Sequence, residues 1–128
     1  MKLRLITASL LCLTSIASAD VSIMDNDQTV AVDCAKDKNV SIIGNGATVT
    51  LTGTCDKVSV SGNKATVTGS ATSVKISGNA NTATLTQVNT IGVTGNKNTV
   101  TYQGTVDAKL KKPKISNPGT GNTITAQK

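Results

Sequence analysis

Few side chains in this sequence are of types that carry out chemistry. The 128 residues include no histidine, glutamate, tryptophan or phenylalanine, and three cysteines. General acid–base catalysis relies mostly on histidine or on paired carboxylates, and zinc sites are built from cysteine, histidine and carboxylate ligands. The composition therefore predicts a protein that is not an enzyme, with no catalytic, cofactor-binding or metal-binding residues.

Asp25 and Asp27 are the residues nearest to a metal-binding motif. Their carboxylates could lend two oxygen ligands to calcium, but an EF-hand loop beginning there would need glycine at its sixth position and glutamate at its twelfth. Those positions hold Val30 and Lys36. The two aspartates are better explained as capping residues of a terminal repeat.

The first 19 residues have the features of an export signal. Lys2 and Arg4 precede an apolar stretch, which is followed by the cleavage motif Ala17-Ser18-Ala19. The apolar stretch is too short for a permanent membrane anchor. The sequence therefore predicts a signal peptide at 1–19, a single mature domain at 20–128 with no transmembrane segment, and a periplasmic or secreted location.

A repeated phrase organises the mature chain. Each copy has β-branched residues, a Gly-Asn-type turn that supplies a positive φ cheaply, and Thr-Val-Thr or a close variant, with degenerate copies at both ends. The turn glycine, or Asp25 in the first copy, falls at positions 25, 44, 62, 78, 95 and 119. Repeats this short cannot bury a face alone and must stack on their neighbours.

The repeats predict an all-β fold. Apolar and polar residues alternate with a period of two, which indicates strands with one buried face. Equivalent positions match from copy to copy, as in-register stacking requires and an antiparallel meander of hairpins does not. We therefore expect a short parallel β-solenoid of about six coils, with roughly 17 residues and two strands per coil. Its interior should hold one column of Val30, Val49, Val67, Ala83, Val100 and Ile124, and another of Ile23, Ile42, Val60, Ile76, Val93 and Ile115. The turns should carry Asn26, Asn45, Asn63, Asn79 and Asn96. A hydrogen-bonded ladder or simple turn chemistry explains these asparagines better than contact with a ligand or metal.

Cys34 and Cys55 are the two cysteines that follow the signal peptide. Their positions relative to the repeat place both at the same corner of adjacent coils, where the Cα separation suits a disulfide. Such bonds persist in oxidising compartments. No C-x-x-C motif and no histidine is present to lower a thiol pKa, so the sequence favours a structural disulfide over a redox site.

Threonines and lysines are the candidate binding residues. Two threonines should face outward on every coil but the first, giving a two-column array whose central members are Thr48, Thr50, Thr66, Thr68, Thr82, Thr84, Thr99 and Thr101. Ice-binding β-solenoids are similar in displaying Thr-x-Thr ranks. A second candidate is contact with an anionic surface through Lys109, Lys111, Lys112 and Lys114. Residues 20–56 carry six aspartates and two lysines, whereas 57–128 carry one aspartate and nine lysines, so the two ends of the rod should have opposite charge.

The phrases Ser-Gly-Asn-x-Asn-Thr-x-Thr and Gly-Thr-Cys55, with the closing Lys-Ile-Ser-Asn-Pro-Gly-Thr-Gly-Asn-Thr-Ile, resemble a family of small exported bacterial proteins. That family is known chiefly as a domain of unknown function built from Gly-Ser-Asn-Asn-Thr-Val-type repeats. The resemblance covers roughly residues 34–126. It implies a secreted or periplasmic β-repeat domain and brings no catalytic residues.

Taken together, these features favour a non-enzymatic exported structural or interaction module of the bacterial cell envelope. Its partner would be an envelope or extracellular component rather than a specific nucleic acid, because no arginine or aromatic residue accompanies the lysines. Two alternatives remain open at this point. One is ice binding through the threonine array, and the other is a self-assembling, curli-like fibre subunit with weak self-association through the solenoid ends.

Overall fold

The computed structural model describes residues 19–127, so the predicted signal peptide lies outside the described residues apart from Ala19. The described chain forms β-strands and no helix. In chain order the strands are β1 (Ala19–Ile23), β2 (Thr29–Asp33), β3 (Asp37–Ile42), β4 (Thr48–Val60), β5 (Thr66–Ile76), β6 (Thr82–Val93), β7 (Thr99–Gly104), β8 (Lys114–Ser116) and β9 (Thr123–Ala126).

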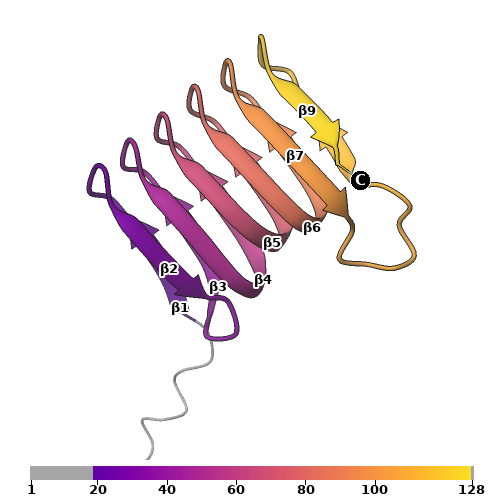
Figure 1. Cartoon of the computed structure of the whole chain (residues 1–128), viewed down its shortest axis with the longest axis horizontal. Coiled ribbons are helices and arrows are strands. Elements are labelled where there is room, and N and C mark those ends of the chain that lie inside the picture. Colours follow the sequence, from indigo (N-terminus) through magenta and orange to yellow (C-terminus); the bar gives the residue numbers. More distant parts are fainter. Residues whose placement is uncertain (1–18, 128) are drawn as a thin grey trace, which may run out of the picture.

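The strands stack as a parallel β-solenoid (Figure 1), as the repeats predict. One sheet face is formed by β1, β3, β8 and the second halves of β4, β5 and β6. The other is formed by β2, β7, β9 and the first halves of β4, β5 and β6. Every pairing between these strands is parallel, and each face has six layers related by five turns of the chain.

The two corners of a coil differ. β4, β5 and β6 run without interruption for 13, 11 and 12 residues, from one face, around a corner and onto the other face. The bend is taken up inside the strands, at Gly53 with φ 78° and Gly69 with φ 142°. At this corner the two expected strands are therefore continuous in β4, β5 and β6, whereas β2 and β3, and likewise β7 and β8, are separate strands.

Valine and isoleucine columns form the dry interior. The column from Val30 to Ile124 is confirmed in full, because each member pairs with its equivalent in the next coil. The second column is confirmed from Ile23 to Val93. Its last member, Ile115, was wrongly predicted. Ile115 pairs with Ile91, because both lie four residues before their turn glycine, and the position of Val93 is taken in the last coil by Asn117.

The turn glycines are required by close stacking rather than by a positive φ. A Cβ at Gly44, Gly62, Gly78, Gly95 or Gly119 would overlap the backbone carbonyl oxygen of the equivalent residue in the preceding coil. None of these five glycines has a positive φ. Asp25 occupies this position in the first coil of the described chain. We call the six positions the glycine file.

The positive φ of each turn lies two residues after the glycine file. Asp27, Gly46, Lys64, Ala80, Lys97 and Gly121 have φ values between 56° and 70°. Side chains other than that of glycine are strained in this region, because Cβ approaches the following carbonyl oxygen. Glycine is therefore the residue that best fits this position, yet four of the six coils do not have it.

We expect Ala80→Gly to stabilise the protein. Relief of left-handed strain of roughly 1–2 kcal/mol outweighs the added entropy of glycine in the unfolded chain, roughly 0.5–1 kcal/mol. The free energy of unfolding should rise by about 0.5–1 kcal/mol in urea denaturation. Ala35→Gly is the control, because Ala35 is also exposed in a turn but lacks a positive φ. Equal destabilisation of both variants would contradict the prediction.

Cys34 and Cys55 form a disulfide, as the repeat spacing predicts. Their Cα atoms are 4.7 Å apart and both residues are fully buried. Cys55 pairs with Ala71, and Ala71 pairs with Val88. The disulfide therefore belongs to the column of inward-facing side chains at the corner within β4, β5 and β6, and it links the first two coils.

Removing this disulfide should weaken the N-terminal coils. With 21 residues of sequence separation, loss of the cross-link should lower the free energy of unfolding by about 3 kcal/mol. The measurement is urea denaturation of the oxidised protein with and without a thiol reductant. The double variant Cys34→Ala/Cys55→Ala is the control, since its unfolding midpoint should not respond to the reductant. An oxidised protein whose midpoint is equally insensitive would refute the expectation.

Candidate functional site

Threonines cover the outer surface of the sheet face that contains β2, β7 and β9. One column is Thr29, Thr48, Thr66, Thr82, Thr99 and Thr123, and the other is Ala31, Thr50, Thr68, Thr84, Thr101 and Thr125. All twelve side chains are exposed or half-buried. Stacked strands are about 4.8 Å apart, and alternate residues of a strand about 7 Å apart. The structure thus brings the eight predicted threonines into one regular array, here called the threonine sheet.

The opposite sheet face has no such regularity. Its two outer columns are Asp20, Asn39, Lys57, Ser73, Thr90, Lys114 and Ser22, Ser41, Ser59, Lys75, Gly92, Ser116. Four of these twelve residues are charged and one is threonine, against eleven threonines in the threonine sheet. A general preference of strands for threonine would act on both faces alike. It therefore does not account for the difference between them.

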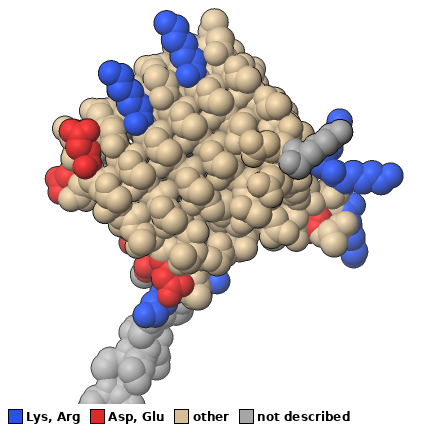
Figure 2. Space-filling model, in the orientation of Figure 1, with Lys and Arg blue, Asp and Glu red and all other residues tan. Residues whose placement is uncertain are grey.

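The threonine sheet is uncharged. Figure 2 has the orientation of Figure 1, in which β2, β7 and β9 lie in front, and it shows a continuous surface of uncharged residues with lysines and aspartates at its margins. Lys64 and Lys97 belong to the turns that precede β5 and β7. The array is thus a broad neutral surface with charges only around it.

The asparagines of the turns form the predicted ladder. Each side-chain oxygen accepts a hydrogen bond from the backbone N–H of the equivalent asparagine in the next coil. These bonds join Asn26 to Asn45 (2.8 Å), Asn45 to Asn63 (2.9 Å), Asn63 to Asn79 (2.9 Å) and Asn79 to Asn96 (3.1 Å). The side chains are therefore engaged in holding coil to coil.

A second ladder lies inside the same turns. Asn81, Asn98 and Asn122 donate from their amides to the carbonyls of Gly62, Gly78 and Gly95, each at 2.9 Å. Their oxygens accept the backbone N–H groups of Ala65, Asn81 and Asn98, each at 2.8 Å. Sequence reasoning missed this ladder. The available signal was an asparagine three residues after the turn glycine in the last three copies, at a position where Ala47 and Ala65 stand in earlier ones.

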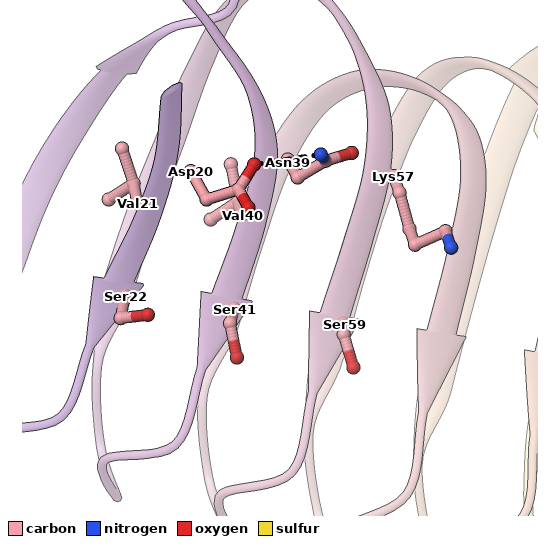
Figure 3. A pocket seen from close by; sticks show the side chains of 8 residues that line it. All are labelled: Asp20, Val21, Ser22, Asn39, Val40, Ser41, Lys57 and Ser59. Carbon is pink, nitrogen blue, oxygen red and sulfur yellow. Dashed lines mark hydrogen bonds between the residues drawn. The ribbon is translucent and has the colours of Figure 1, made fainter. Parts of the chain in front are cut away.

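A shallow groove of about 190 Å³ crosses the N-terminal end of the opposite sheet face. Figure 3 shows its two rows of side chains on β1, β3 and β4, with Asn39 hydrogen-bonded to Asp20. The lining residues are Asp20, Val21, Ser22, Asn39, Val40, Ser41, Lys57 and Ser59. The serines and the Asp20–Asn39 pair belong to the outer columns described above, so the groove is the space between two stacked columns.

The predicted lysine cluster lies at the C-terminal end of the rod. Lys109, Lys111 and Lys112 belong to the loop between β7 and β8, Lys114 begins β8, and all four are exposed. Among residues 19–127 there is no group of three or more histidine, cysteine or acidic side chains arranged to hold a metal ion. No helix capable of crossing a membrane is found in that part of the chain.

Stacked parallel coils with a repeated turn define a β-solenoid repeat protein. More specifically, the chain belongs to the family described as "Protein of unknown function (DUF3060)", which it matches at residues 42–70 and 62–121. These segments run from the end of β3 to the turn before β9, and the match agrees with the resemblance to a domain of unknown function. No curated protein and no solved structure matches the chain.

Proposed function

We propose that this protein is a non-enzymatic, exported structural or interaction module of the bacterial cell envelope, and that the threonine sheet is its contact surface. The observation that carries the proposal is the contrast between the two sheet faces. One presents eleven threonines in register and no charge, while the other mixes charged, amide and hydroxyl side chains. The buried disulfide supports export, since such bonds persist in oxidising compartments.

The threonine sheet is suited to an extended partner rather than to a small molecule. Its hydroxyls can donate and accept hydrogen bonds, and its methyl groups supply apolar contact at the same positions. Both asparagine ladders fix the coil-to-coil spacing at one edge of this surface. A rigid surface loses little entropy on binding, which favours contact with a flat or repetitive partner.

The test compares variants with two added lysines on opposite faces. Thr68→Lys/Thr84→Lys places charges at the centre of the threonine sheet, and Ser59→Lys/Ser73→Lys adds the same charge to the other face. Binding of each purified protein to isolated cell envelopes is measured by sedimentation at high salt, which screens contacts between lysines and anionic headgroups. We expect the first variant to lose most of its binding and the second to bind as the wild type does. Equal binding by both variants would show that the threonine sheet is not the contact surface.

Ice binding is the second candidate, and it is favoured by the threonine columns being in register over six coils. Such an array can order water against a flat surface without competing charges. Thermal hysteresis and ice-recrystallisation assays at micromolar protein test it. Inhibition should be lost in Thr68→Lys/Thr84→Lys and kept in Ser59→Lys/Ser73→Lys. A folded wild-type protein without effect in either assay eliminates this candidate.

A further inference from the structure

The connection between β7 and β8 is much longer than the equivalent connections in the preceding coils. Thr68 and Ser73 are five residues apart and Thr84 and Thr90 six, whereas their counterparts Thr101 and Lys114 are thirteen apart. The added residues do not extend either sheet. In Figure 1 they project from the C-terminal end of the stack as a loop. We call residues 105–114 the basic loop.

The basic loop combines positive charge with an exposed apolar side chain. It contains four lysines and a single aspartate, Asp107, which gives a net charge of +3. Leu110 lies among the lysines and is 41% exposed. Lysines alone would suit any polyanion, but an exposed leucine between them adds a group that only a partner with an apolar region can bury.

Hydrogen bonds hold the backbone of the basic loop, some to the solenoid and some within the loop. The side-chain oxygen of Asn89, on β6, accepts from the N–H groups of Val106 and Asp107, each at 2.9 Å. The Thr105 hydroxyl donates to the carbonyl of Leu110 at 2.8 Å. These bonds engage the loop backbone and leave the side chains of Leu110 and the lysines exposed, so it is the loop backbone that is held in place.

We propose that the basic loop attaches the protein to an anionic lipid bilayer. The lysines contact headgroup phosphates, and Leu110 enters the boundary between headgroups and acyl chains. The argument rests on charge complementarity together with the exposed leucine. This surface is at one end of the rod and is separate from the threonine sheet, so the proposal goes beyond the proposed function and stands or falls independently of it.

The experiment is co-sedimentation with vesicles of phosphatidylglycerol and phosphatidylethanolamine at low salt, using exported protein purified after expression of the full chain. Replacing the four lysines of the loop by glutamine should weaken binding by roughly fivefold per lysine. The matched control replaces four other exposed lysines, Lys57, Lys64, Lys75 and Lys97, by glutamine, and should bind nearly as the wild type does. Vesicles of phosphatidylcholine should bind none of the proteins.

Direct insertion is tested by fluorescence, because the chain contains no tryptophan. The emission of Leu110→Trp should shift to shorter wavelength when the vesicles are added. That of Met24→Trp should not, although Met24 is 65% exposed at the opposite end of the rod.

Three results would overturn the proposal. The first is no binding of the wild type to phosphatidylglycerol vesicles, and the second is an equal loss of binding in the matched lysine control. The third is binding of inorganic polyphosphate as tight as that of the vesicles, together with no emission shift in Leu110→Trp. That third outcome would make the basic loop a general polyanion contact. Circular dichroism of each variant confirms that it is folded.

Discussion

Gly78→Ala is expected to lower the free energy of unfolding by more than about 4 kcal/mol, the range reserved for severe core defects. The new Cβ would overlap the carbonyl oxygen of Gly62, and the next nearest atoms are the Gly62 carbonyl carbon and the Asn81 amide nitrogen. The overlapping atoms are backbone, so no side-chain rotation can relieve the contact. Adjacent coils would have to separate at this turn, which breaks their parallel pairing.

Since a domain of this size is stable by only about 5–15 kcal/mol, Gly78→Ala should greatly reduce the yield of folded protein. The measurement is urea denaturation or, if too little folds, the soluble fraction after expression. Gly92→Ala is the matched control, because a Cβ at Gly92 meets no atom within 4 Å. Its stability should stay within about 0.5 kcal/mol of the wild type. Similar effects of the two substitutions would show that the turns can move apart at little cost.

Asn98→Ala is expected to lower the free energy of unfolding by about 3 kcal/mol. Asn98 is fully buried, and its side chain accepts the N–H of Asn81 and donates to the carbonyl of Gly78. Removing the amide leaves both backbone groups without these partners, and an unsatisfied buried polar group costs about 1–3 kcal/mol. The removed atoms also leave a void between two coils.

Asn96→Ala provides the matched comparison for this prediction. Asn96 lies two residues away in the same turn and is exposed. It belongs to the ladder that runs from Asn26 to Asn96, and it joins that ladder through its backbone N–H, which alanine keeps. Asn96→Ala should lower the free energy of unfolding by less than about 0.5 kcal/mol. Urea denaturation of the two variants gives both values. If both substitutions lowered the free energy of unfolding equally, the second ladder, formed by Asn81, Asn98 and Asn122, would contribute no more than ordinary turn residues do.

The stacking of the coils could be predicted from sequence because it follows from alternation and recurrence. A column such as Val49, Val67 and Ala83 requires only that equivalent positions face the same way. The error at Ile115 has the same origin, since Asn117 stands in the last copy where Val93 stands in the copy before it, and Ile115 is the nearest apolar residue ahead of the turn apart from Pro118. Counting back from Gly119 gives the observed pairing with Ile91, because the turn, rather than the nearest apolar residue, sets the register.

The role of the turn glycines could not be predicted in the same way. A glycine in a turn can permit a positive φ, or it can permit two backbones to approach closely. The sequence does not distinguish these two roles. Here the positive φ falls on residues such as Lys64 and Ala80, while Gly62 and Gly78 permit contact with the coil before them. The second use depends on how closely adjacent turns stack, which is a property of the assembled solenoid.

Much of the candidate site could be predicted, since the threonine array follows directly from the repeat. The exposure of Leu110 could not be predicted from the sequence. An apolar residue among lysines can either be buried as an anchor of the loop or be exposed to solvent. Val106 and Pro113, in the same connection, are half-buried and buried. The bonds that the Asn89 oxygen accepts and that the Thr105 hydroxyl donates hold the loop backbone in the conformation that leaves Leu110 exposed.

Asp25 limits where further repeats can be added to this solenoid. Each later coil has glycine where Asp25 stands, and only a residue without a side chain lets another turn lie directly before it. Duplicated repeats can therefore be accommodated after the first coil but not ahead of it. For the same reason a neighbouring copy cannot continue the stack in register from this end, and filament growth by simple addition of molecules would first require Asp25→Gly.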